Sequence, residues 1–167
     1  MAKQQRTELL LSIIIIIITA ILMFAYYNRW FSLAYTVGPF RAIHYLAFAG
    51  TLYIAFSVPI IAYLKRRRPQ KYQTLTRIHM FMNLVAFLLI SLHFAGQLGR
   101  PADFYPELGT GLALYIAMVL QVFTGLAFRL NQKRFVKPIT TRFLHVGLAL
   151  VFYIVIVTHI LHGLGII

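Results

Sequence analysis

Four histidines inside two apolar segments are the residues of this sequence whose spacing points to chemistry. His79 and His93 lie in one apolar segment, fourteen positions apart. His145 and His159 lie in another apolar segment at the same separation. Fourteen helical residues rise about 21 Å and complete almost four turns, so both histidines of a pair share one helix face. Because neutral imidazole is a good axial ligand for haem iron, the spacing predicts two bis-histidine haem sites stacked along the helices.

The direction of the two segments predicts which histidines face each other. They are the third and fifth apolar segments, so they cross a membrane in the same direction. His79 is then expected to face His145 at the cytoplasmic level. His93 is expected to face His159 at the outer level, with His162 as the alternative ligand that the spacing favours less. Haem propionates favour cations near the membrane faces, and the candidate partners are Arg77 and Arg142 for the inner haem and Arg100 and Arg41 for the outer haem.

A hydrogen bond between helices and a zinc site are the alternatives to haem for these histidines. A single intramembrane histidine often makes only a hydrogen bond between helices, worth about 0.6–2 kcal/mol. Two pairs with equal spacing favour haem over that interpretation. Zinc is disfavoured because its sites need three or four clustered ligands. The remaining outer histidines, His44 and His162, are candidates for contact with a quinone or electron acceptor, or are ordinary interface residues.

The composition indicates a membrane protein. The chain has 167 residues, of which 60% are hydrophobic and 11% are charged, whereas soluble domains carry about 25% charged residues. The absence of cysteine excludes disulfides, iron–sulfur ligation and covalent haem attachment. Only Glu8, Asp103 and Glu107 are acidic, so a paired-carboxylate hydrolase is excluded and no catalytic residue is assigned.

Five segments are apolar and long enough to form membrane-spanning helices. We expect an all-α protein in which the whole chain, residues 1–167, is one transmembrane helical bundle. The first segment is interpreted as a retained helix, because it is long for a secretory signal and lacks an A-x-A cleavage site, although the signal interpretation stays open. The expected helices are roughly residues 9–27, 40–64, 75–98, 108–130 and 139–167.

The distribution of positive charge predicts the orientation. Thirteen of the sixteen lysines and arginines lie on the side of the N-terminus, so the positive-inside rule places the N-terminus in the cytoplasm and the C-terminus outside. The net charge of +13 is therefore attributed to membrane topology, and nucleic acid is not expected as a partner. The basic loops at Lys65–Arg68 and Arg129–Lys137 are interpreted as topology signals beside anionic lipid, with docking of a protein partner as the alternative. The expected location is the plasma membrane.

These features resemble the ferric-reductase-like transmembrane domain, which NADPH oxidases share with the haem subunit of the periplasmic methionine sulfoxide reductase system. The resemblance covers residues 40 to 165 and rests on H-x13-H in the third and fifth helices, an inner N-terminus and a basic loop between helices two and three. It implies that His79, His93, His145 and His159 ligate two b haems. The oxidases continue through a sixth helix into a cytoplasmic FAD/NADPH domain. This chain is expected to end outside after five helices, so no flavin or nicotinamide site is expected in it.

The four-helix core of respiratory cytochrome b is a second resemblance. It is carried by "TRFLH" at 141–145 with His159 and His162 downstream, and helices two to five would correspond to the four helices of that core. The ligand spacing is the same. The first ligand of each pair lies on the outer side in that family, opposite to the orientation that the charges predict here. This resemblance therefore ranks second.

Together, the residues predict a membrane subunit with two haem b groups that carries electrons from a cytoplasmic or quinol donor to an outer acceptor. Such a subunit needs other proteins of a redox complex, or a quinol, for catalysis. The first alternative is a quinone-reactive cytochrome b anchor of a respiratory complex. The second alternative is a haem-free structural subunit. Outward electron flow is expected, because a membrane potential that is negative inside favours it by about 2.3 kcal/mol per charge per 100 mV.

Overall fold

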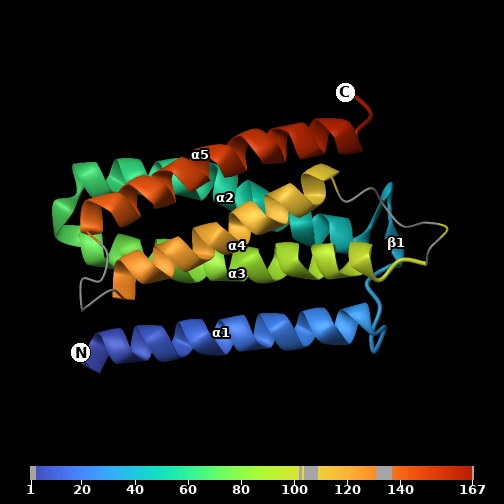
Figure 1. The fold of residues 1–167 in the computed structure, drawn as a ribbon, viewed down its shortest axis with the longest axis horizontal. Coiled ribbons are helices and arrows are strands. Elements are labelled where there is room, and N and C mark those ends of the chain that lie inside the picture. Colours follow the sequence, from blue (N-terminus) through green and yellow to red (C-terminus); the bar gives the residue numbers. More distant parts are fainter. Residues whose placement is uncertain (1–2, 102, 104–108, 131–136, 167) are drawn as a thin grey trace. The chain divides into compact units, whose positions relative to one another are not determined.

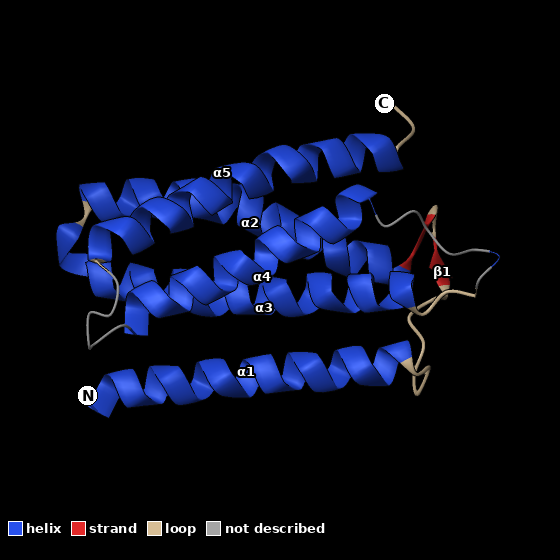
Figure 2. Cartoon of the chain, viewed as in Figure 1, coloured by secondary structure: helices blue, strands red, loops and turns tan. Residues whose placement is uncertain are grey.

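The five expected membrane spans are all helices in the structure. The computed structural model describes residues 3–101, 103, 109–130 and 137–166. Each helix is long and apolar enough to cross a membrane, which confirms an all-α, multi-pass membrane protein. The helices are α1 (Lys3–Tyr27), α2 (Ala42–Arg67), α3 (Tyr72–Leu98), α4 (Gly109–Leu130) and α5 (Pro138–Gly163) (Figures 1 and 2).

Two short elements lie in the connections on either side of α2. Strands β1 (Thr36–Val37) and β2 (Phe40–Arg41) form an antiparallel hairpin, which the sequence did not predict. The hairpin turns at Gly38, whose φ of +59° suits glycine because it has no Cβ. A 3-10 turn, η1 (Pro69–Lys71), joins α2 to α3.

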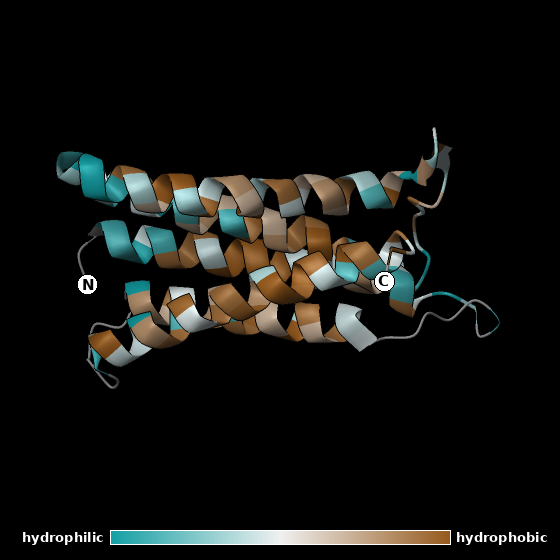
Figure 3. Ribbon diagram, turned by 90° about the horizontal axis from the view of Figure 1, so that it is seen from above, coloured by the Kyte–Doolittle hydropathy of each residue, from teal (hydrophilic) through white to brown (hydrophobic). Residues whose placement is uncertain are grey.

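Several helices extend beyond the apolar runs that predicted them. α1 begins at Lys3 rather than at residue 9, and α2 continues to Arg67 rather than ending at 64. Colouring by hydropathy shows apolar residues along the middle of the helices and polar residues at many of their ends (Figure 3). Helical hydrogen bonding therefore continues into charged residues that hydropathy alone assigned to loops. The predicted helix ends at 108 and 167 lie outside the described residues.

The fifth helix ends earlier than expected, at Gly163. Gly165 adopts a left-handed φ of +68°, and its N–H donates to the carbonyl of His162 at 3.0 Å. The N–H of Ile166 donates to the carbonyl of Leu161 at 2.9 Å. This is the Schellman arrangement, in which a residue with positive φ satisfies the last carbonyls of a helix and stops it.

The same arrangement ends α1, but with a non-glycine residue at the left-handed position. Arg29 has a φ of 60°, and the N–H of Trp30 donates to the carbonyl of Ala25 at 2.9 Å. The Arg29 side chain donates from Nη2 to the carbonyl of Gly99 at 3.2 Å. This bond links the end of α1 to the end of α3 and helps to offset the cost of a left-handed arginine.

The helices form two compact units. One unit is Leu10–Pro106, which contains most of α1 with α2 and α3, and the other is Met1–Leu9 with Glu107–Ile167, which contains α4 and α5. In the first unit, α2 and α3 are close, because a Cβ added at Gly50 would lie 3.1 Å from the carbonyl oxygen of Ala86. Small residues allow such close helix contact in membranes. The expectation of one transmembrane domain stays a prediction.

The first unit has a small apolar core at one end of its helices. Tyr26 of α1, Ile43 of α2 and Leu92 of α3 are buried together there with Ala95. Of the five spans, α3 is the most buried, with 44% of its most apolar window buried against 11–17% in the others. α3 is therefore the central helix of this unit.

An ion pair joins two segments of the second unit that are far apart in the sequence. Arg129 donates from Nε and Nη2 to both carboxylate oxygens of Glu8, at 3.0 and 3.1 Å. Relative exposure of the two side chains is 24% for Arg129 and 5% for Glu8. Two parallel bonds between a guanidinium and a buried carboxylate are the strong form of this interaction.

Glu8→Gln tests the contribution of this pair, because it keeps the side-chain shape and removes the charge. We expect the free energy of unfolding in detergent micelles to fall by about 1–3 kcal/mol, less than for a fully buried pair because Arg129 is partly exposed. Asp103 is exposed, so Asp103→Asn is the matched control and should change stability by less than about 0.5 kcal/mol. Equal effects of the two substitutions would contradict this interpretation.

Candidate functional site

His145 of α5 lies against a polar site on α4. Its Nδ1 is 3.1 Å from Oγ1 of Thr124, and its Nε2 is 3.3 Å from Nε2 of Gln121. A Cβ added at Gly125 would lie only 3.0 Å from Cε1 of the imidazole. Glycine at this position therefore leaves the space that the ring occupies, and both ring nitrogens have polar neighbours on the same helix.

His159 lies against a second site of the same kind on α4. Its Nδ1 is 3.1 Å from Oγ1 of Thr110. A Cβ added at Gly111 would lie 3.3 Å from its Cε1. α4 thus presents a threonine followed by a glycine to His145 and to His159.

Sequence reasoning missed these α4 residues, although their spacing was visible. The dipeptide Thr-Gly occurs at Thr110–Gly111 and again at Thr124–Gly125, fourteen positions apart. This equals the separation of His145 and His159. Because antiparallel helices with equal spacings meet at two levels, the repeated dipeptide was the signal that could have identified the partners.

His79 of α3 has its described polar partner on its own helix. Nδ2 of Asn83 is 3.0 Å from Nδ1 of His79 and also donates to the His79 carbonyl. Asn83 was not among the predicted residues. It is the polar residue one turn after the histidine within an apolar helix, which was the available signal.

His93 of α3 lies beside His44 of α2. Their ring centroids are 5.4 Å apart with the planes inclined by 58°. The Phe40 ring lies near the His44 imidazole, with 6.4 Å between their centroids. Two histidines that the sequence placed in different roles are therefore neighbours in this unit.

Two of the four predicted propionate partners lie close enough to influence each other. Burial lowers the pKa of Arg100, and the positive charge of Arg41 lowers that pKa further. Positive charge is therefore concentrated at this end of the first unit, where an anionic group would be favoured. The other two predicted partners differ in exposure, since Arg77 on α3 is half-buried and Arg142 on α5 is exposed.

The predicted ligand pairs join residues of the two units. His79 and His93 belong to one unit with His44, while His145 and His159 belong to the other. The pairing of α3 histidines with α5 histidines therefore stays a prediction. His162, the alternative outer ligand, lies in the last turn of α5 and is exposed, whereas His159 is half-buried.

The individual imidazoles fit axial ligation of haem. All four are half-buried on apolar helices, and glycine gives the two α5 rings their space on α4. Within the described parts of the chain, no three histidine, aspartate or glutamate side chains gather into a metal cluster. Haem ligation by two imidazoles needs no such cluster.

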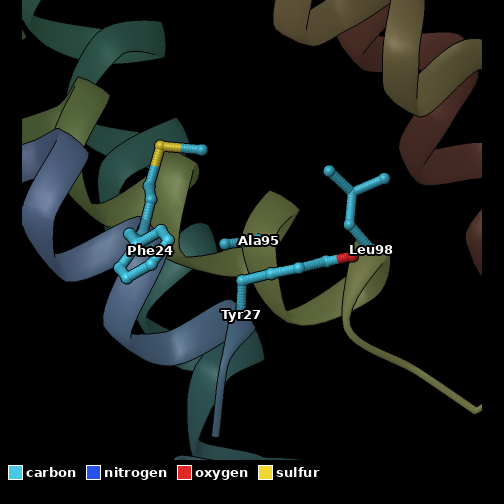
Figure 4. A pocket seen from close by; sticks show the side chains of 5 residues that line it. Phe24, Tyr27, Ala95 and Leu98 are labelled. Carbon is cyan, nitrogen blue, oxygen red and sulfur yellow. The ribbon is translucent and has the colours of Figure 1, made fainter. Parts of the chain in front are cut away.

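An open apolar hollow of about 220 Å³ lies in the first unit, lined by Met23, Phe24, Tyr27, Ala95 and Leu98. The labelled side chains of α1 and α3 approach one another around it in Figure 4. The surface it offers is apolar, so it suits contact with hydrocarbon rather than chemistry.

Comparison with known protein families, curated proteins and solved structures finds no match to this chain. The resemblances to the ferric-reductase-like domain and to cytochrome b therefore stay predictions.

The role of Gly125 in seating His145 can be tested with two alanine substitutions. No described atom lies within 4 Å of a Cβ added at Gly147, so Gly147→Ala should stabilise the protein by about 0.5–1 kcal/mol through helix propensity. Gly125→Ala has the same propensity gain, but its methyl group would press on Cε1 of His145. We expect it to be less stable than Gly147→Ala by at least about 1 kcal/mol in denaturant unfolding. Equal stability of the two variants would show that the imidazole is not held at Gly125.

Proposed function

We propose that this protein is a di-haem b-type cytochrome subunit that carries electrons across a membrane. The observation that carries the proposal is the fourteen-residue spacing of histidines, repeated on α3 and α5, both of which are long and apolar enough to span a bilayer. An intramembrane ionisable residue is a functional candidate by default. Four of them in two equally spaced pairs favour ligation over chance packing.

The proposed haem ligands are His79 with His145 on the cytoplasmic side, and His93 with His159 on the outer side. Haem, when bound, supplies a one-electron redox centre at each level. The chain's own contribution would be two imidazoles for each haem, on helices that are long and apolar enough to span a membrane. Two imidazole ligands would leave no open position for oxygen, which favours electron transfer.

The positive end of the first unit supports the assignment of the outer level. Arg41 and Arg100 interact electrostatically there, and the His44–His93 contact lies in the same unit. Cations of this kind would bind haem propionates through charge-assisted hydrogen bonds. The proposal places the N-terminus in the cytoplasm and directs electrons outward, from a cytoplasmic or quinol donor to an outer acceptor.

The contact of His44 with His93 favours a second candidate function, a quinone-reactive anchor of a respiratory complex. Nδ1 of His44 is buried and makes no hydrogen bond to the described residues. A quinone oxygen is one group that such a nitrogen could bind. In this function, a quinol analogue would reduce the haems of the isolated subunit, and His44→Ala would slow that reduction without removing haem.

The optical spectrum of the purified protein tests the proposed function directly. After haem-sufficient expression, we expect a reduced-minus-oxidised spectrum of low-spin, bis-histidine b haem. We expect haem content to approach two per chain, as two histidine pairs require. A haem content near zero would contradict the proposal and support a haem-free structural subunit.

Single substitutions test the assignment of ligands. His145→Ala should remove the inner haem and leave about one haem per chain, because the outer pair keeps both imidazoles. His44→Ala is the matched control, a half-buried histidine outside the proposed ligand set, and should keep both haems. His162→Ala should also keep both. If His162→Ala loses the outer haem while His159→Ala keeps it, His162 rather than His159 is the outer ligand.

A further inference from the structure

The two Thr-Gly sites of α4 approach the same ring nitrogen of His145 and of His159. In both cases the threonine Oγ1 is 3.1 Å from Nδ1, of His145 at Thr124 and of His159 at Thr110. In both cases the following glycine lies against Cε1. A repeated contact to one specific ring atom is more than packing, because either nitrogen of a freely rotating ring could face a hydroxyl.

The direction of the hydrogen bond at His145 follows from the other bond of Thr124. A threonine hydroxyl has one proton to donate, and Thr124 Oγ1 has two backbone acceptors, the carbonyls of Leu120 at 2.8 Å and Gln121 at 3.2 Å. When the proton goes to one of these carbonyls, Oγ1 accepts from the imidazole, and the proton of His145 is then on Nδ1. In this tautomer Nε2 carries the lone pair and accepts from the Gln121 amide at 3.3 Å.

We infer that α4 is the positioning helix for His145 and His159, with Thr124 and Thr110 holding the proton on Nδ1 so that Nε2 is the ligating nitrogen. Donation from Nδ1–H fixes the tautomer and the ring orientation and raises the basicity of the nitrogen that binds metal. The consequence for haem binding rests on the proposed function, whereas the tautomer itself does not.

Gln121 has a separate part in the same arrangement. Its amide faces Nε2, the nitrogen that would bind iron. In the described state the Gln121 amide therefore donates a hydrogen bond to the lone pair on Nε2 of His145. Gln121 and Gly125 are one turn apart on α4, with Thr124 between them on the same face. The site therefore positions the ring through Thr124 and Gly125, and satisfies its ligating nitrogen through an amide that a ligand can replace.

The tautomer can be measured on the full chain without haem. In protein labelled with ¹⁵N-histidine, in detergent micelles, we expect the His145 resonance to show a protonated Nδ1 and an unprotonated Nε2. His145→Gln assigns that resonance by its loss. Thr124→Val, which keeps the shape and removes the acceptor, should move the proton toward Nε2, and Thr124→Ser should keep it on Nδ1. An unprotonated Nδ1 in the unsubstituted protein, or no change in Thr124→Val, would overturn the inference.

The control for these variants is Thr19→Val on α1. Thr19 is buried, whereas Thr124 is half-buried, and like Thr124 it donates to the carbonyl four residues earlier, that of Ile15, at 2.8 Å. Thr19→Val therefore removes the same hydroxyl and the same kind of helix bond, so it should leave the His145 tautomer unchanged. A change of equal size in Thr19→Val would assign the effect to general destabilisation and overturn the inference.

Haem titration gives the second readout. Loss of a hydrogen bond to a metal-binding histidine typically weakens metal affinity by about 10-fold to 100-fold. Thr124→Val should therefore bind the inner haem, which His145 would ligate, more weakly by that factor. Thr124→Ser should bind it about as tightly as the unsubstituted protein does. Full affinity in Thr124→Val would overturn the positioning role and leave the proposed function intact. If the unsubstituted protein binds no haem, the proposed function fails, and the ¹⁵N measurement alone decides the tautomer.

Discussion

The structure depends on the need of each imidazole in an apolar helix for a polar partner. A polar group in hydrocarbon cannot turn to water, so its hydrogen bonds must come from neighbouring helices or from its own helix. His145 and His159 each lie against a threonine hydroxyl of α4. His79 has Asn83 within α3. His93 lies beside the ring of His44 of α2, which is a ring contact rather than a hydrogen bond. The positions of the histidines thus select the polar and small residues on the helices around them.

The helices could be predicted from the sequence because hydrophobic length is a property of each segment alone. Their ends could not, because these depend on local backbone conformation and on charged residues that continue the helix. Gly165 stops α5 through a left-handed conformation that hydropathy does not report. Arg29 does the same for α1, although glycine or asparagine is the usual residue at such a position.

The candidate site could be predicted only in part, for a related reason. The spacing of the histidines shows which of them share a helix face, but not the rotation of that face toward another helix. Gln121, Thr124 and Gly125 could therefore not be identified from α5 alone, although the spacing of the two Thr-Gly dipeptides on α4 equals that of His145 and His159. The contact of His44 with His93 likewise depends on the close approach of α2 and α3 at Gly50. Such contacts are a property of helix pairs rather than of single segments.

The pair between Glu8 and Arg129 has a consequence for how the protein is made. The two residues are 121 positions apart. Because synthesis begins at the N-terminus, the Glu8 carboxylate exists long before its guanidinium partner has been made. Until α4 is inserted, the Glu8 carboxylate has to be solvated by water or paired with another cation. Once α4 is in place, the bonds from Arg129 to Glu8 hold the first turns of α1 against it. Proteolytic removal of α1 would therefore leave Arg129 without this carboxylate.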